Sequence, residues 1–178
     1  MGLGRDNIYL ISVGRMVKRK GYDTLLRALA KIKDEKVKLI ILGEGPEREN
    51  LDRIIVEESL QERVILPGFV TEEQKFQYLS CSDIYVLSSV HEGFGIVLQE
   101  AMQVGLPIVA TNYGGQVDLI EDGVNGLLVE HCSVDALVDG IQRLLSDRAL
   151  MSQMKQDNLE KIKEFHAGVI AEQYIDCV

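Results

Sequence analysis

The chain has 178 residues, which is enough for one well-buried domain. Lys and Arg number 19 against 28 Asp and Glu, and the formal net charge of −9 argues against a nucleic-acid-binding surface. Hydrophobic residues make up 46% of the chain, but no apolar run approaches the roughly 20 residues that span a bilayer. The cysteines Cys81, Cys132 and Cys177 are spaced for neither disulfides nor zinc, which favours reduced thiols and a cytoplasmic location.

Short apolar runs rich in β-branched residues predict six strands. Their nearly unbroken apolar character is typical of parallel strands that are covered on both faces. The predicted strands are Ile8–Val13, Val37–Leu42, Arg63–Leu66, Ile84–Leu87, Ile108–Ala110 and Gly126–Val129.

Amphipathic stretches with helix-end signals lie between these runs. Asp23 is predicted to cap the first helix, and Pro46 is predicted to fall in the first turn of the second. Thr71-Glu72-Glu73-Gln74 has the pattern of a capping box, and Ser133 is predicted to begin a later helix. Gly105-Leu106-Pro107 is expected to end the helix that contains Glu100.

The alternation of strands and helices predicts an α/β fold with a doubly wound, mostly parallel six-stranded sheet. Residues 148–178 have a polar helical pattern and are expected to form a C-terminal tail outside the sheet. Ligands bind at the carboxyl ends of the strands in such a fold, so the loops after the first five strands are the candidates for a site.

The first two loops carry basic residues and glycines. Gly14 to Gly21 includes Arg15 and Lys20, which can hold a phosphate, although a solvated surface turn is the alternative. Gly43-Glu44-Gly45-Pro46 has only half of a dinucleotide-binding fingerprint, and a tight strand-to-helix turn is the preferred interpretation.

The third and fifth loops give weaker signals. Pro67 to Thr71, with Phe69 and Val70, can pack a base and read its edge through main-chain groups, or it is a routine turn with a buried Phe. The loop from Tyr113 to Asp118 can border a sugar, and its alternative is a flexible turn into a short helix.

The fourth loop, His91 to Glu100, gives the strongest signal. It places Glu92 and Glu100 eight positions apart, with two glycines between them, where a helix follows a strand. Glycines allow close approach of the backbone, free N–H groups at a helix start bind anions, and carboxylates accept hydrogen bonds from hydroxyls. A nucleotide sugar has this layout. The alternative is that both glutamates are ordinary helix-start acids favoured by the helix dipole.

Nothing in the sequence indicates a metal or a nucleophile. The histidines His91, His131 and His166 are far apart, and no Asp-x-Asp accompanies the glutamate loop. No nucleophile elbow is present. A site without a metal or other cofactor is therefore expected.

Taken together, these motifs closely resemble the nucleotide-binding half of retaining glycosyltransferases with the GT-B fold, the group 1 family. The resemblance runs from Val13 to about Leu145, and several motifs occur in the family's order. They are Gly14-Arg15 with Lys20-Gly21, Gly43-Glu44-Gly45-Pro46, Gly68-Phe69-Val70, Glu92-Gly93-Phe94-Gly95 with Glu100-Ala101, Gly105-Leu106-Pro107-Ile108-Val109-Ala110-Thr111, Gly114-Gly115, and Glu121-Asp122-Gly123-Val124-Asn125-Gly126.

The resemblance assigns roles to individual residues. It implies that Arg15 and Lys20 neutralise the diphosphate of the donor and that Glu92 lies beside the transferred sugar, which makes these three the expected catalytic residues. The remaining donor contacts that it implies are Phe69 and Val70 at the base, Gly93, Phe94, Gly95, Ile96 and Val97 at the sugar and phosphates, and Glu100 at the ribose. It also implies retention at the anomeric carbon, no required metal, a UDP or GDP sugar as donor, and a glycan or lipid-linked glycan as acceptor in polysaccharide biosynthesis.

The chain departs from the family pattern in three places. Ser88-Ser89 stand where Pro-Ser is common, and Val117-Asp118 stand where Pro-Glu is common. The third departure is that the family's N-terminal acceptor domain is absent. We therefore expect residues 1–178 to be a single donor-binding domain that transfers no sugar alone and that partners the N-terminal domain of the same protein. Attachment to the cytoplasmic face of a membrane through that domain stays open.

Two other functions remain as alternatives at this point. A sugar-nucleotide epimerase with the GT-B fold would use the same cleft but needs catalytic acids that the sequence does not reveal. A noncatalytic nucleotide-binding module would keep the cleft without the transfer reaction.

Overall fold

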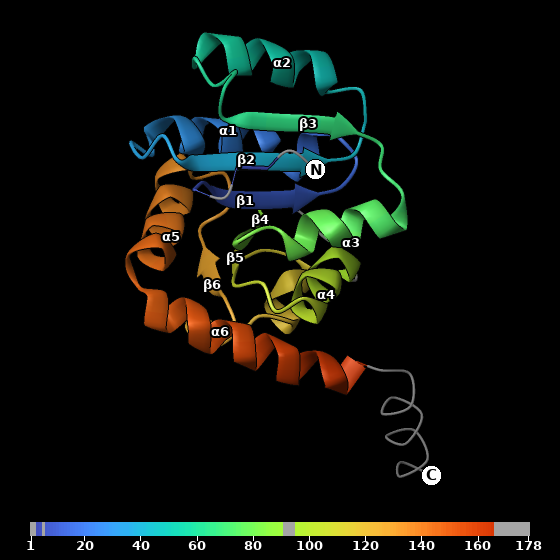
Figure 1. Cartoon of the computed structure of the whole chain (residues 1–178), viewed down its shortest axis with the longest axis vertical. Helices are drawn as coiled ribbons and strands as arrows, with labels where there is room; N and C mark the ends of the chain where they lie inside the picture. Colours follow the sequence, from blue (N-terminus) through green and yellow to red (C-terminus); the bar gives the residue numbers. More distant parts are fainter. Residues whose placement is uncertain (1–2, 5, 91–94, 166–178) are drawn as a thin grey trace.

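The computed structural model describes residues 3–4, 6–90 and 95–165. Within these residues six strands form one sheet in the order β3-β2-β1-β4-β5-β6, and all neighbouring pairs are parallel (Figure 1). The strands are β1 (Ile8–Val13), β2 (Val37–Leu42), β3 (Val64–Gly68), β4 (Ile84–Leu87), β5 (Ile108–Thr111) and β6 (Leu127–Val129). The predicted α/β sheet is thus confirmed.

In the described part of the chain, six α-helices and three short 3-10 helices connect and cover these strands. The α-helices are α1 (Tyr22–Lys31), α2 (Arg48–Glu57), α3 (Glu72–Ser80), α4 (Ile96–Gln103), α5 (Val134–Ser146) and α6 (Arg148–Lys161). The 3-10 helices are η1 (Lys18–Lys20), η2 (Gly115–Asp118) and η3 (Ile162–Phe165).

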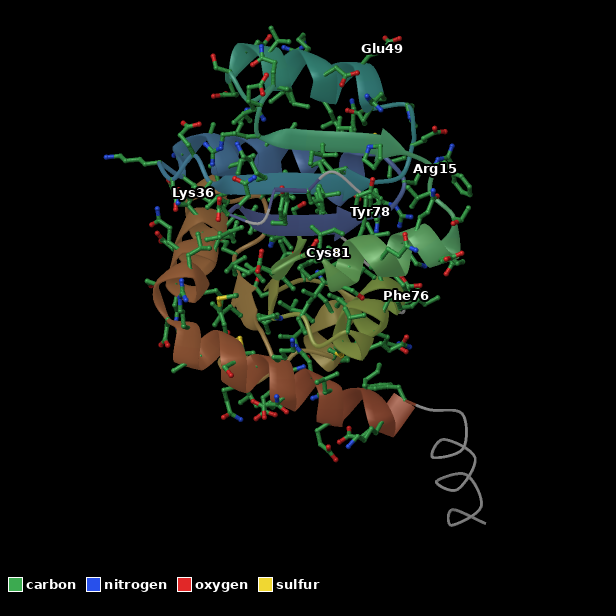
Figure 2. The ribbon with its side chains drawn as sticks, in the orientation of Figure 1. Arg15, Lys36, Glu49, Phe76, Tyr78 and Cys81 are labelled. Carbon is green, nitrogen blue, oxygen red and sulfur yellow. The ribbon has the colours of Figure 1, made fainter. Side chains whose placement is uncertain are left out.

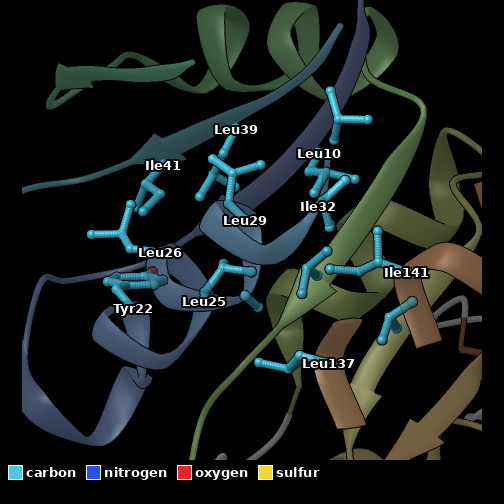
Figure 3. Close-up of a cluster of buried hydrophobic side chains, with 14 of the residues drawn as sticks. Leu10, Tyr22, Leu25, Leu26, Leu29, Ile32, Leu39, Ile41, Leu137 and Ile141 are labelled. Atoms are coloured by element: carbon cyan, nitrogen blue, oxygen red, sulfur yellow. The ribbon is translucent and has the colours of Figure 1, made fainter. Parts of the chain in front are cut away.

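Helices cover both faces of the sheet. Adjacent residues of a strand point to opposite faces, so each strand contributes side chains to both layers. Leu10 belongs to a buried cluster with side chains of α1, α2 and α5, whereas its neighbour Ile11 belongs to a second cluster with side chains of α3 and α4. Figure 3 shows the first cluster, in which Leu29 of α1 and Ile141 of α5 converge with the strand residue Leu39. This arrangement is the doubly wound fold that the sequence predicts.

The strand β3 departs most from its predicted bounds. It begins one residue later, at Val64. The residue before it, Arg63, is buried, and its guanidinium donates to the carbonyls of Ile32 (3.0 Å) and Val37 (3.1 Å). The strand also continues to Gly68, through Pro67, which has no N–H to donate. The strand tolerates this proline because β3 is an edge strand of the sheet. Its register with β2 also shifts near this point, between Ile40 and Leu42.

Two predicted helix starts are wrong. The cap of α1 is Gly21, in the left-handed conformation (φ 63°), and Asp23 lies inside the first turn, where it pairs with Arg27 at 3.2 Å. Pro46 lies one residue before Glu47, the cap of α2, and so outside the first turn. The first helix thus begins earlier than predicted and the second begins later.

The other predicted helix ends are confirmed. Thr71 and Gln74 form the capping box of α3, and Ser133 accepts from the N–H of Ala136 at 3.2 Å to cap α5. After α4, Gly105 has a φ of 70°, which favours glycine and ends the helix.

The tail packs outside the sheet, as predicted, in its described part. The helix α6 contacts α4 and α5 (Figure 1). Its fully buried Asn158 donates to the carbonyls of Leu106 and Asn125, both at 2.8 Å, and accepts from the Asn125 side chain at 3.1 Å. Residues 166–178 of the predicted tail lie outside the described residues.

Candidate functional site

The candidate site lies where the winding of the sheet changes direction. The chain runs from β1 outward through β2 to β3, then returns to place β4 on the other side of β1. Loops that leave the carboxyl ends of β1 and β4 therefore diverge, and such a switch point is where ligands bind in doubly wound sheets. In Figure 1 the arrowheads of β1, β2 and β3 mark this edge, and α3 and α4 begin beside it.

The first and second loops are held together along their backbones. The N–H of Met16 donates to the carbonyl of Glu44 at 2.8 Å. A Cβ atom at Gly43 would lie 2.3 Å from the Gly14 carbonyl oxygen, and one at Gly45 would lie 2.3 Å from the Met16 oxygen. The two glycines after β2 thus permit close packing against the first loop. This supports the preferred interpretation of the second loop as a tight turn.

The two basic residues predicted to bind phosphate both lie in the first loop region. Arg15 is exposed beyond the ends of the strands (Figure 2). Lys20 is only 6% exposed, and its Nζ lies close over Gly14, since a Cβ built there would be 3.1 Å from Nζ. Its backbone carbonyl accepts from Ser88 Oγ at 2.8 Å, and Gly21 is packed against the Ser88 carbonyl. The loop after β4 therefore holds the segment that carries Lys20.

The third loop exposes the aromatic ring that was predicted to face a base. Phe69 is 79% exposed, so the alternative of a buried Phe is wrong. Its N–H donates to Glu44 Oε1 at 3.3 Å, which ties the third loop to the second. Val70 is half-buried and packs on the core beneath. A large apolar side chain at this edge is available for contact with a ligand.

The fourth loop is described only from Gly95 onward. His91, Glu92, Gly93 and Phe94 lie outside the described residues. Gly95 caps α4 in the left-handed conformation (φ 63°), and Ile96 is 64% exposed while Val97 is half-buried. The first N–H groups of a helix have no partner within it, so this helix start presents donors at the candidate site.

Glu100 lies one turn inside α4, as predicted, and its carboxylate meets a buried lysine. Lys75 of α3 places its Nζ 2.7 Å from Glu100 Oε1 and 2.8 Å from Glu72 Oε2. The side chains of Lys75 and Glu100 are 11% and 15% exposed, whereas that of Glu72 is 81% exposed. Glu100 is therefore no solvated helix-start acid, because a buried countercharge holds it in place.

The surroundings of Lys75 favour its charged form. Burial by itself lowers the pKa of Lys75, but the hydrogen bonds and charges of Glu100 and Glu72 outweigh it and hold the pKa above its ordinary value of 10.5. In the part of the chain that the structure describes, Glu100 Oε2 is buried without a hydrogen-bond partner. An unsatisfied buried carboxylate oxygen is costly, so this atom calls for a donor beyond those that the described residues supply.

The fifth loop is tied to the fourth by buried polar groups. Gln116 is fully buried and its Nε2 donates to Thr111 Oγ1 at 2.9 Å, while Thr111 Oγ1 donates to the Ser89 carbonyl at 2.5 Å. The ring of Tyr113 stacks obliquely on His131, with centroids 5.0 Å apart. The predicted short helix is limited to η2, and its anchored Gln116 argues against a flexible turn.

The described members of the predicted site therefore share one edge of the sheet, and hydrogen bonds from backbone and side-chain groups link the loops that carry them. These residues are Arg15, Lys20, Phe69, Val70, Gly95, Ile96, Val97 and Glu100. Sequence analysis missed Lys75, although a signal was present. Lys75 precedes the buried Leu79 by four residues, so the two share a face of α3, and a lysine on a buried face requires an acidic partner.

The described residues show neither a candidate metal site nor a candidate membrane span. Among them, no three His, Cys, Asp or Glu side chains are grouped so that they could hold a metal ion. In the same part of the chain, no helix combines the length and apolar character needed to cross a membrane.

Comparison with known proteins places this geometry in context. The family described as glycosyl transferases group 1 matches residues 2–161. The N-acetylgalactosamine-N,N'-diacetylbacillosaminyl-diphospho-undecaprenol 4-alpha-N-acetylgalactosaminyltransferase of Campylobacter jejuni is 34% identical over 164 residues, which are 92% of this chain and 44% of the relative. The chain spans less than half of the length of the curated relatives it matches.

Solved structures show the same fold. A crystal structure of Anabaena HepE in complex with UDP superposes with a TM-score of 0.87 at 27% identity, over 96% of this chain and 48% of that one. The C-terminal domain of a group 1 glycosyl transferase (LpcC) from Francisella tularensis has a TM-score of 0.79 at 26% identity, over 88% of this chain and 84% of that one. The fold, the arrangement of the loops and the family match agree, and the chain belongs to the group 1 glycosyl transferases.

Proposed function

We propose that the chain is the donor-binding domain of a retaining glycosyltransferase. It binds a nucleoside diphosphate sugar at the carboxyl edge of the sheet, and in the full-length protein it supports transfer of the sugar to a glycan or lipid-linked acceptor. The observation that carries this proposal is the placement of the buried Lys20 and the partly buried Glu100 just beyond the two loops that diverge from the switch point between β1 and β4.

The diphosphate is assigned to the side of the site that carries positive charge. Arg15 offers a fork of donors, Lys20 offers a point charge, and the start of α4 offers backbone N–H groups. When the bond from the anomeric carbon to the phosphate oxygen breaks, negative charge collects on the departing diphosphate. These groups lower the barrier because they stabilise that charge where it develops.

The two ends of the nucleotide sugar are assigned to the flanking loops. The Glu100 carboxylate accepts hydrogen bonds from ribose hydroxyls, since it is held by Lys75 and left with one unsatisfied oxygen. The exposed ring of Phe69 and the backbone of Val70 face the base. Glu92 to Phe94 are assigned to the sugar by the resemblance alone, because they lie outside the described residues.

The acceptor site is assigned to a second domain. The chain aligns with less than half of its curated relatives, and the Francisella structure that it matches over 84% of its length is described as a C-terminal domain. We therefore expect residues 1–178 to bind nucleotide but to transfer no sugar by themselves, and we expect no metal requirement. In the full-length protein, the acceptor hydroxyl adds to the same face of the sugar that the diphosphate leaves, and its proton passes to the departing phosphate oxygen.

Titration calorimetry of the chain with UDP, GDP and ADP tests the site. One nucleotide should bind in the micromolar to millimolar range, and Arg15→Ala should weaken it by about tenfold or more, because a charge-assisted hydrogen bond contributes about 1.5–3 kcal/mol. Arg53→Ala removes an equal charge from the exposed face of α2, where Arg53 pairs with Glu57, and should leave affinity unchanged. Equal affinity in all three proteins would remove the phosphate assignment.

The reaction itself is tested on the full-length protein with a donor that the calorimetry identifies. NMR of the product should show the same anomeric configuration as the donor. An inverted product would contradict the retaining mechanism while leaving the nucleotide site intact.

A further inference from the structure

The contact between Lys75 and Glu100 joins two helices that begin at different loops of the site. The helix α3 follows directly on the loop with Phe69 and Val70, and α4 follows on the glutamate loop. The N–H of Lys75 donates to the carbonyl of Thr71, the cap of α3, at 2.8 Å. Lys75 therefore lies one turn from the base-facing loop and reaches across to the neighbouring helix.

The hydrogen bonds of Lys75 leave its ammonium group fully engaged. An ammonium has three donors. Nζ contacts Glu72 Oε1 at 2.9 Å, Glu72 Oε2 at 2.8 Å and Glu100 Oε1 at 2.7 Å. With its side chain 11% exposed, Lys75 has no donor left for a ligand. Its effect on a bound nucleotide must pass through Glu100.

The contact also orients Glu100. Oε1 is fixed by Lys75, and Oε2 is the buried atom that has no partner within the described structure. The Glu100 side chain as a whole is 15% exposed, whereas Oε2 itself is buried. One oxygen is thus committed to the protein, and the other is kept for a donor from a ligand.

We propose that Lys75 is a positioning residue that holds the Glu100 carboxylate in register with the base-facing loop, so that a vicinal diol on the ligand is recognised together with the base. This inference rests on the proposed function, because it takes the ligand to be a nucleoside diphosphate. It adds that selection of ribose over deoxyribose depends on a lysine that never contacts the nucleotide.

A purely structural role would make a different prediction. If Lys75 only fastened α3 to α4, its loss would lower stability and weaken all nucleotides alike. If it positions Glu100, its loss selectively removes the advantage of ligands that carry the diol. The ratio of the dissociation constants of the dideoxy and ribo forms of one nucleotide therefore separates the two roles.

The experiment is calorimetry with the tightest of UDP, GDP and ADP and with its 2′,3′-dideoxy counterpart. In the wild-type chain the dideoxy form should bind about tenfold or more weakly, as expected for lost hydrogen bonds to a charged group. In Lys75→Met the ratio of the dideoxy to the ribo dissociation constant should fall to within about threefold of one, mainly because the ribo form binds more weakly. Lys75→Arg should keep a ratio near that of the wild type. Lys31→Met, which removes an exposed lysine paired with Asp135, is the matched control and should change neither constant.

The outcomes separate this inference from the proposed function. If Lys75→Met keeps the wild-type ratio while Glu100→Gln loses it, Glu100 binds the diol and the role of Lys75 is refuted. If the wild-type ratio is itself near one, the assignment of Glu100 to the ribose fails and the inference fails with it. If no nucleotide binds, the proposed function fails.

A second measurement needs no variant. The side-chain 15N resonance of Lys75 in the wild-type chain should shift on addition of the ribonucleotide and shift less with the dideoxy form, because only the former engages Glu100. Equal shifts with both nucleotides would overturn the proposal, even if Lys75→Met does not fold.

Discussion

The packing of the first loop against the second makes a specific prediction for Gly45→Ala. The added Cβ would lie 2.3 Å from the oxygen, 2.7 Å from the nitrogen and 2.8 Å from the carbonyl carbon of Met16. These are backbone atoms, so no side-chain rotation relieves the contact. The first loop must move away from the second, and Arg15, the residue before Met16, must move with it.

The size of the effect follows from the contacts that such a movement breaks. Met16 donates to the Glu44 carbonyl at 2.8 Å and accepts from the Glu47 N–H at 3.0 Å. Losing these two hydrogen bonds costs about 1 kcal/mol each, and the residual overpacking adds about 1–3 kcal/mol. The expected loss in the free energy of unfolding is therefore about 3–5 kcal/mol, which corresponds to a fall in the urea midpoint of roughly 1–2 M.

Gly123→Ala is the matched control for this prediction. Gly123 has a φ of 79°, but a Cβ there meets nothing within 4 Å, so its substitution costs only the left-handed strain of about 1 kcal/mol. Urea unfolding should separate the two variants clearly, and calorimetry with the tightest of UDP, GDP and ADP should show weaker binding for Gly45→Ala alone. If both variants unfold at the same urea concentration and bind equally, the first two loops are not in the contact described here.

Three further predictions concern other residues. Asn158→Leu leaves the buried carbonyls of Leu106 and Asn125 without a donor, so the free energy of unfolding should fall by about 2–4 kcal/mol in urea titrations, and a change under about 0.5 kcal/mol would contradict the burial of this network. Phe69→Ala should alter that free energy by less than about 0.5 kcal/mol, because the side chain is 79% exposed, yet weaken the nucleotide by about tenfold in calorimetry through lost contact with the base. The pKa of Lys75 is raised on folding, so its contribution to stability is complete below pH 10.5 and is lost as pH rises past the raised pKa. The stability of the wild-type chain should therefore fall more steeply above pH 10.5 than that of Lys75→Met, and parallel curves would refute the pairing.

The strands of the sheet were predictable from local sequence because each is a nearly continuous apolar run with both faces buried. The bounds of β1, β2 and β4 agree with prediction. The helix α4 was predictable too. An unusual environment for Glu100 could also be expected, because this acid interrupts an apolar pattern where an acid is otherwise unfavourable. The helix starts at Asp23 and Pro46 were wrong, because the preferred cap residues were chosen without knowing how many residues the loops need in order to turn.

The fold class, the order of the loops and the charges that each loop carries follow from local periodicity and composition, so they could be predicted. The pairing of Lys75 with Glu100 across 25 positions, and the packing of Gly43 and Gly45 against the backbone of the first loop, emerge only in the folded chain. Such contacts depend on the order of the strands in the sheet. That order brings distant segments to one edge, and no local pattern encodes the distances between them.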